Sequence, residues 1–442
     1  MSDVIETVIE RMAGEDVEAA RAAEAALEWM TGGENRLELL TQERVQRFLW
    51  YELPMKWLTD TDHHRLVVAS LTRALDLLDL PRYAAICGSS ISGDVLNAYS
   101  RSDREGKRAF LDAQAASGIS PPDLPEFVWG SVMGPEESRA LSSTAELLEL
   151  AIAGGELVLG APRWKAQQQT VTRDHLTLRR AELEGRTLMD AVESERRQQW
   201  LERSRSPSRR GLIAPLAGRI RSPVTLPSGA DDPLPTLRWL LEQLVEGQPL
   251  TQTGNLNRAF VQTAAQRFAG WRPPLGPPRG EDDVYELQLT RELASRLRLV
   301  RRSGKKLLLT TKGRSLLADP DRLWRAAAHA VLPDHSFDRA TGEITLAVLG
   351  SADTVGYQEL NEKVAKVIRE EGWHEQRSDD APDGHQISIS MHRTTNLLRA
   401  LALYTVDGDW RDRRYGLTEV GTATALEALH HAATGPRFHI LG

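Results

Sequence analysis

Cysteine, lysine and long apolar runs are scarce in this 442-residue sequence. The single cysteine, Cys87, excludes an internal disulfide and a cysteine-based zinc knuckle, and it fits a reducing compartment. No run of about 18 apolar residues occurs, and residues 1–12 carry acidic side chains where a signal peptide has a basic end and an apolar centre. These absences predict a cytoplasmic protein that does not contact a membrane.

Lysine supplies only eight of the 55 basic residues, and the other 47 are arginine. Together with abundant alanine, this bias is typical of a GC-rich bacterial genome, so a single arginine is no sign of function. The hydrophobic fraction of 41% and the charged fraction of 26% are those of a folded chain, and the net charge is -7. At roughly 150 residues per domain, the length predicts about three domains.

Residues 1–195 are expected to form a helical domain. Strong helix formers in residues 16–30 stop at two glycines, and residues 63–80 place leucine, valine and alanine at helical spacing. A polar helix is expected over residues 170–197, interrupted at Gly185. This domain is where we expect a protein partner to bind.

Residues 196–233 are expected to be a linker. Within them, residues 203–227 are dense in arginine, serine and proline and have no apolar periodicity, which favours a solvated, flexible connector. The alternative is functional, because Arg/Ser-rich segments also bind nucleic acid or accept phosphate.

Three helices followed by a hairpin are expected between residues 235 and 310. The helices are expected at residues 235–246, 256–268 and 284–299, and the hairpin has strands at 299–302 and 306–310 around a turn that contains Gly304. Nine basic residues and one acidic residue lie between Arg291 and Arg314, so this stretch carries +8 and the rest of the chain -15.

A second copy of this pattern follows. Residues 309–314, LTTKGR, resemble residues 417–422, LTEVGT, and each is preceded by a helix-like run, a short strand and a polar turn. In the second copy the helix is expected at residues 391–401 and the returning strand at 414–417. The shared L-T-x-x-G has a physical reason: the strand ends at Leu, Thr caps the next helix, and Gly admits close packing of that helix.

Three helices followed by a two-stranded wing resemble the winged helix-turn-helix family, over about residues 235–318 and more weakly over 337–433. In that family the third helix enters the major groove and the wing contacts the backbone or minor groove. The expected fold is therefore mainly α: an N-terminal helical bundle followed by two winged-helix-like α+β modules, residues 234–332 and 333–442. Residues 250–256, LTQTGNL, also look like part of the C-terminal region of uncharacterised actinobacterial proteins, a likeness that implies no activity.

The resemblance implies which side chains contact double-stranded DNA. Arginine suits this role because its planar fork binds guanine or phosphate and its charge releases counterions. The contacts implied for the first module are Arg291, Ser295, Arg296 and Arg298 on the third helix and Arg301, Arg302, Lys305 and Lys306 on the wing. Secondary candidates in the second module are His392, Arg393, Asn396 and Arg399 on its helix and Arg411, Arg413 and Arg414 on its wing. Arg291 and Arg298, seven residues apart, are predicted to share one helical face.

Two features count against DNA binding. The loop at residues 271–283 is long for this family, and it ends in Glu281-Asp282-Asp283, which would repel phosphate. The second wing also carries three aspartates, so the first module is the better DNA candidate and the second is expected to serve in packing or in a homodimer. The alternative hypothesis is a helical assembly protein whose winged helices bind no nucleic acid.

Motifs for catalysis, cofactors or metals are thin, and we expect neither an enzyme nor a bound metal or cofactor. Residues 88–93, GSSISG, have the glycine spacing of a phosphate loop without its lysine, and they are interpreted as a helix junction. His63 and His64 are interpreted as a polar helix start, and Cys87 as a buried apolar side chain. The histidines after residue 373 show no metal-ligand spacing. An enzyme of an unrecognised class stays open as a third hypothesis.

Overall fold

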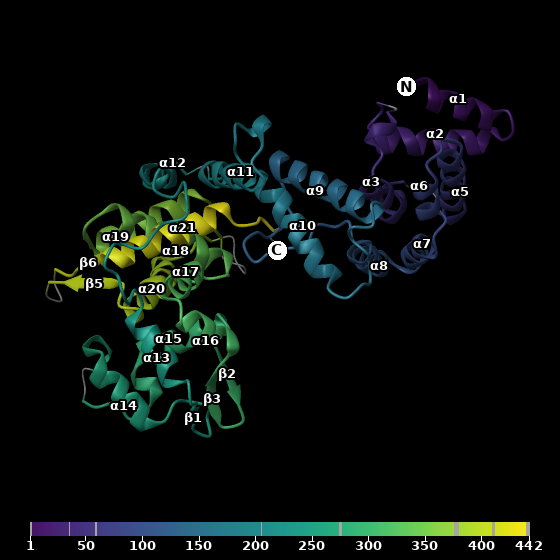
Figure 1. The fold of residues 1–442 in the computed structure, drawn as a ribbon. Helices are drawn as coiled ribbons and strands as arrows, with labels where there is room; N and C mark the ends of the chain where they lie inside the picture. Colours follow the sequence, from purple (N-terminus) through teal and green to yellow (C-terminus); the bar gives the residue numbers. More distant parts are fainter. Residues whose placement is uncertain are drawn as a thin grey trace. The chain divides into compact units, whose positions relative to one another are not determined.

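The computed structural model describes residues 2–34, 36–57, 60–204, 206–273, 276–374, 380–408 and 412–438. These residues form two compact units: unit 1 comprises residues 1–195 and 436–442, and unit 2 comprises residues 196–435. Unit 1 is helical, and unit 2 combines helices with two small three-stranded sheets (Figure 1). Among the described residues, no helix has the length and apolar character needed to cross a membrane.

The helices of unit 1 begin and end where local chemistry demands. Asp16 accepts hydrogen bonds from the first backbone amides of α2, and Gly32 ends that helix with a φ of 66°. Pro54 follows a π-helical turn, as expected of a proline that disrupts regular hydrogen bonding. The helix expected at residues 170–197 is instead two helices, α10 and α11, separated by a short 3₁₀ turn. In order, the elements of unit 1 are α1 (Ser2–Ala13), α2 (Val17–Thr31), η1 (Leu37–Leu39), α3 (Gln42–Arg47), η2 (Phe48–Glu52), α4 (Leu53–Lys56), α5 (Thr61–Leu77), α6 (Pro81–Cys87), α7 (Ser90–Arg101), α8 (Asp103–Ala116), α9 (Pro135–Ala153), α10 (Trp164–Thr177), η3 (Ala181–Leu183) and α11 (Leu188–Glu202), which crosses into unit 2.

Unit 2 contains one order of elements twice: helix, strand, helix, helix, hairpin, helix. The first run is α13 (Pro235–Gln243), β1 (Gln248–Pro249), α14 (Arg258–Arg267), α15 (Tyr285–Arg296), β2 (Val300–Ser303), β3 (Lys306–Leu309) and α16 (Thr311–Leu317). The second is α18 (Ser336–Ser351), β4 (Val355–Gly356), α19 (Tyr357–Glu370), α20 (Gly384–Ala400), β5 (Tyr404–Asp407), β6 (Arg414–Leu417) and α21 (Glu419–Thr434). The remaining elements are α12 (Pro207–Ile213), η4 (Ala214–Leu216), η5 (Ala269–Trp271), η6 (Glu281–Asp283) and α17 (Pro320–His329).

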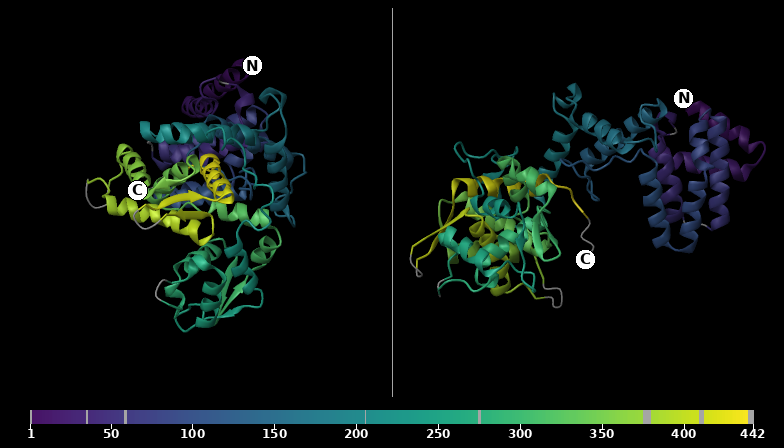
Figure 2. Two further views of the ribbon diagram at one scale, coloured as in Figure 1. Left: turned by 90° about the vertical axis from the view of Figure 1, so that its left-hand side faces the viewer. Right: turned by 60° about the horizontal axis from the view of Figure 1, so that its bottom comes forward.

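The two sheets have the same topology. The first has the antiparallel order β1-β3-β2 and the second the order β4-β6-β5, so in each the last strand lies in the middle. The hairpin registers pair Val300 with Leu309 and Tyr404 with Leu417. Figures 1 and 2 show the two sheets apart from one another within unit 2. Both hairpins predicted from the sequence are therefore present. In each sheet a third, short strand, which precedes the second helix of its run, pairs with the last strand of the hairpin.

The junction from third helix to hairpin repeats in atomic detail. The amide of Leu299 donates to the carbonyl of Ala294, and that of Leu403 donates to Leu398, both at 2.8–2.9 Å. These bonds close a Schellman motif in each copy. The left-handed position of this motif is usually glycine, but here it is Arg298, with a φ of 57°, in the first copy and Ala402, with a φ of 60°, in the second.

The L-T-x-x-G motif acts as predicted. Thr310 Oγ1 accepts from the amide of Gly313 at 3.0 Å, and Thr418 Oγ1 accepts from that of Gly421 at 2.9 Å. A Cβ added at Gly313 would lie 2.3 Å from the carbonyl oxygen of Leu299, and one at Gly421 would lie 2.0 Å from the equivalent oxygen of the second copy. Only glycine fits this approach of helix to hairpin.

The prediction that residues 196–233 form a flexible linker is wrong. Its segment 207–216 forms α12 and η4, and Trp200, Ile213 and Ile220 belong to the core of unit 2. Arg209 is only 1% exposed and makes ion pairs with Glu343 and with Glu371, which follows the last residue of α19. Ser204, Ser206 and Arg209 are therefore buried hydrogen-bonding groups, and composition alone does not distinguish them from the exposed arginines and serines of the same stretch.

The expected boundary between residues 332 and 333 does not separate two cores. A single apolar cluster runs from α13 to α21, and α15 packs against α20. Trp324 of α17 is fully buried and donates to Thr424 Oγ1 of α21 at 2.8 Å. Residues 436–438, the last that the structure describes, belong to unit 1 rather than to the last module. The two runs are thus two halves of one unit.

Candidate nucleic-acid interface

The hairpin of β2 and β3 and its flanks carry the basic residues predicted from the sequence. Eight of them are exposed: Arg296, Arg298, Arg301, Arg302, Lys305, Lys306, Lys312 and Arg314. None of the eight forms an ion pair with a described residue, although the chain as a whole is acidic. We call these eight residues the basic wing. Exposed cations without carboxylate partners attract an anionic ligand without first breaking a bridge.

The helix termination determines how these residues are displayed. The third helix ends at Arg296 rather than near residue 299, because the Schellman motif turns the chain at Arg298. The prediction that Arg291 and Arg298 share one helical face is therefore wrong. Arg298 belongs with the hairpin, and Ser295 is exposed on the last turn of α15.

Arg291 is held inside the module. Its guanidinium makes an ion pair with Glu281 at 2.5 Å and donates to the carbonyl of Gly254 at 2.8 Å. Glu281 is 2% exposed and also accepts from the amide of Leu256 at 2.6 Å. Arg291 thus ties the turn after β1 to the turn before α15. Glu281, expected to repel phosphate, is instead a buried partner of Arg291.

Backbone carbonyls hold part of the basic wing in place. Arg302 Nε donates to the carbonyl of Gly304 at 3.0 Å, which bends the side chain over its own turn. Arg296 donates to the carbonyl of Ala330, and Arg314 reaches that of Val245 at 3.5 Å. A carbonyl partner leaves the full positive charge of the guanidinium in place.

Two of the corresponding cations of the second half form ion pairs. Arg399 contacts Glu286 of α15 at 3.0 Å, and Arg393 pairs with Asp338. Arg414 donates to Thr354 Oγ1 at 2.9 Å. Asn396 is half-buried on α20, and His392 stacks on Tyr357, with ring centroids 5.7 Å apart. The other wing candidates are Arg413, which is exposed, and Arg411, which lies outside the described residues.

A histidine pair and a buried glutamate, which sequence reasoning missed, join α17 to α21. His329 Nε2 lies 2.8 Å from Glu427 Oε1, and the rings of His329 and His431 stack with centroids 3.9 Å apart. Burial and the neighbouring His329 lower the pKa of His431 to about 4. Burial alone would raise the pKa of Glu427, but hydrogen bonds from His329 and the Val224 amide outweigh it and lower the value to about 2. Glu427 and His431 are one helical turn apart, but their partner His329 lies 98 residues before Glu427, so no local spacing in the sequence reveals the cluster.

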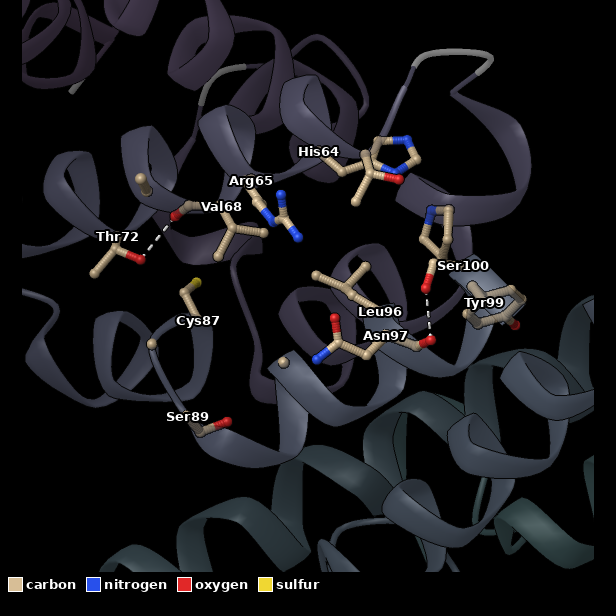
Figure 3. A pocket seen from close by; sticks show the side chains of 15 residues that line it. His64, Arg65, Val68, Thr72, Cys87, Ser89, Leu96, Asn97, Tyr99 and Ser100 are labelled. Atoms are coloured by element: carbon tan, nitrogen blue, oxygen red, sulfur yellow. Dashed lines mark hydrogen bonds between the residues drawn. The ribbon is translucent and has the colours of Figure 1, made fainter. Parts of the chain in front are cut away.

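The three weak motifs of unit 1 meet at one cleft. Its lining includes His64, Cys87, Ser89 and Gly93, together with side chains of α5 and α7 (Figure 3). Gly88-Ser89 is the expected helix junction, since α6 ends at Cys87 and Ser89 caps α7. Among the described residues, no group of three or more potential metal ligands is present. Sequence reasoning missed the cleft because it treated each motif alone.

Searches of protein-family models, curated proteins and solved structures with this chain found no match. The basic wing, the histidine pair and the cleft are therefore interpreted from their own geometry.

Proposed function

We propose that the chain binds double-stranded DNA through the basic wing, as the first of two winged-helix modules. The observation that carries the proposal is a hairpin and flanks with eight exposed cations and no described ion pair, in a chain of net charge -7. The order helix, strand, helix, helix, hairpin, with the last strand central, supports the winged-helix assignment.

The geometry favours contacts to phosphates over contacts to bases. The face of α15 that carries Glu286 packs toward α20, and Glu292 is exposed on the same helix. A helix that is partly covered and carries a carboxylate enters a major groove poorly. The hairpin is not covered in this way, so we expect affinity to come mainly from counterion release along the DNA backbone.

A salt titration tests this mechanism. If five cations of the hairpin contact phosphates, the logarithm of the association constant falls with the logarithm of salt concentration with a slope of about -4.5. Affinity for duplex DNA should then drop roughly 500-fold between about 50 and 200 mM salt. An affinity that does not change with salt would end the proposal.

A charge-matched pair of variants locates the interface. Changing Arg298, Arg301 and Lys305 together to alanine should reduce the slope by about 2.7. The control changes three exposed cations of α8, Arg104, Lys107 and Arg108, and so removes the same charge from unit 1. Equal losses in the two triple variants would mean that net charge, not the basic wing, governs binding.

A second candidate function, assembly with another protein, is favoured by the packing of α15 on α20. That contact shows a third helix of this chain used as a protein-packing surface. Light scattering and capture of partners from a nuclease-treated lysate distinguish the two functions. Partners that disappear after nuclease treatment would contradict assembly and support the DNA proposal.

A further inference from the structure

A cleft of about 740 Å³ lies in unit 1 between α5 and α7 (Figure 3). Its volume is within the range of about 300–1,000 Å³ that is usual for small-molecule sites. The cleft is separate from the basic wing, which belongs to unit 2.

The packing of the surrounding helices leaves this space open. Helix α5 packs against α2 and α6, whereas α7 packs against α8 and η2. The residues that line the gap include small ones: Ala69 on α5, Ser89 at the cap of α7, and Gly93 on its first turns. A Cβ added at Gly93 would meet no atom within 4 Å, so even this helical glycine faces open space. Two helices that face each other across small residues form a slot.

The slot has an apolar floor. Val68, Leu96 and Cys87 line it, and Cys87 is 2% exposed. Burial raises the pKa of Cys87 to about 12, so its sulfur is a neutral, apolar thiol. An apolar body of a ligand would therefore gain by leaving water here.

The polar lining is cationic and hydrogen-bonding. Figure 3 shows the Arg65 guanidinium and the Asn97 amide directed into the space between the helices. His64 and Ser100 also line the slot, and none of its described lining residues is an aspartate or a glutamate. Arg65 pairs at 2.9 Å with Asp62, but both side chains are highly exposed, and such a pair holds weakly against a competing anion.

We propose that this cleft binds a small organic anion with one carboxylate and an apolar body. The carboxylate accepts from Arg65 and Asn97, and the apolar body lies against Val68, Leu96 and the thiol. A single guanidinium matches one negative charge, and the absence of a lysine after residues 88–93 argues against a polyphosphate.

Fluorescence binding with two probes tests the site on the full chain. The anion 8-anilinonaphthalene-1-sulfonate carries one negative charge on an apolar body, and N-phenyl-1-naphthylamine is its uncharged counterpart. Decanoate should displace the anionic probe at least tenfold more effectively than decanol does. Equal displacement by the two would overturn the requirement for a carboxylate.

Two substitutions test whether the probes bind in the cleft. Gly93→Leu fills the slot and should weaken binding of both probes at least tenfold; the backbone tolerates it because no atom lies near the new Cβ. Gly211→Leu is the matched control, because Gly211 also lies in a helix, α12, with nothing within 4 Å. Circular dichroism confirms that each variant folds. Unchanged binding by Gly93→Leu, or an equal loss in Gly211→Leu, would overturn the site.

Arg65→Gln supplies a test that leaves the slot open. It should weaken the anionic probe at least fivefold and leave the uncharged probe unchanged. Because Arg65 is an exposed side chain, this variant folds even if Gly93→Leu does not. Unchanged affinity for the anionic probe would refute the role of Arg65 and with it the class of ligand.

Discussion

Replacing Gly421 with alanine should destabilise unit 2 because the new Cβ would meet backbone. The Cβ would lie 2.0 Å from the carbonyl oxygen of Leu403 and 3.1 Å from Thr418 Oγ1. A carbon–oxygen contact normally needs about 3.3 Å, so helix and hairpin must separate by roughly an ångström. That movement strains the bond from the Thr418 amide to Leu403, which is 3.1 Å long, and the cap on Gly421.

The expected cost is a difference between opposing terms. Overpacking costs about 1–3 kcal/mol, and loss of the threonine cap costs about 1 kcal/mol. The weakened backbone bond adds about 1 kcal/mol, and the better helix propensity of alanine returns about 1 kcal/mol. The free energy of unfolding should therefore fall by about 2–4 kcal/mol, which for a unit of this size lowers Tm by roughly 4–16 °C.

Thermal and urea denaturation of the full chain, followed by circular dichroism, measure this effect. Gly313→Ala should behave in the same way, since its Cβ would lie 2.3 Å from the Leu299 carbonyl oxygen. Gly211→Ala is the control: it is helical, its Cβ meets nothing within 4 Å, and it should stabilise the protein by up to about 1 kcal/mol. If Gly421→Ala is as stable as the original chain while Gly211→Ala behaves as expected, the packing argument fails.

Three further predictions concern single side chains. Ala402 has a φ of 60°, so Ala402→Gly should remove left-handed strain and raise the unfolding free energy by up to about 1 kcal/mol in urea denaturation; a loss of stability would contradict this. The pKa of His431 is about 4 in the folded protein, against 6.5 when unfolded, because of burial and His329. The unfolded chain takes up this proton first, so stability should fall as pH drops from about 6.5 to about 4, and His431→Asn should flatten that part of the profile. Glu427, with a pKa of about 2, adds a loss only below its unfolded value of about 4.5 in both proteins; an identical profile in the variant would refute the assignment to His431. Cys87, with a pKa of about 12, should react with a disulfide reagent at pH 8 more than about 100-fold more slowly in the folded chain than in urea, and similar rates would contradict its burial.

Local chemistry accounts for what the sequence predicted well. The hairpins follow from apolar runs separated by polar turns, and the L-T-x-x-G motif fixes a cap and a close approach within four residues. The carbonyl oxygen that leaves no room for a Cβ at this glycine lies only about 14–18 residues earlier in the chain. It belongs to Leu299 for Gly313 and to Leu403 for Gly421, so the motif and its partner lie in one continuous segment.

Contacts between distant segments account for what it predicted poorly. Arg291 was predicted to contact DNA from the third helix, but it forms an ion pair with Glu281. Glu281 lies in a loop that was expected only to repel phosphate. Arg209 looked solvated by composition, yet its carboxylate partner Glu343 is 134 residues away. The cleft near Cys87 depends on how α5 and α7 are held apart, which no local pattern encodes.

The continuous apolar cluster of unit 2 also bears on how the chain unfolds. Trp324 of α17, which lies between the two halves in the chain, is buried against α21 of the second half, and Trp200, before either half, joins the same cluster. Neither half can melt without uncovering the other, so calorimetry should record one cooperative transition for unit 2 instead of two. The two runs of elements therefore form one cooperative folding unit. Cutting the chain between residues 332 and 333 would yield two fragments with exposed cores, not two domains.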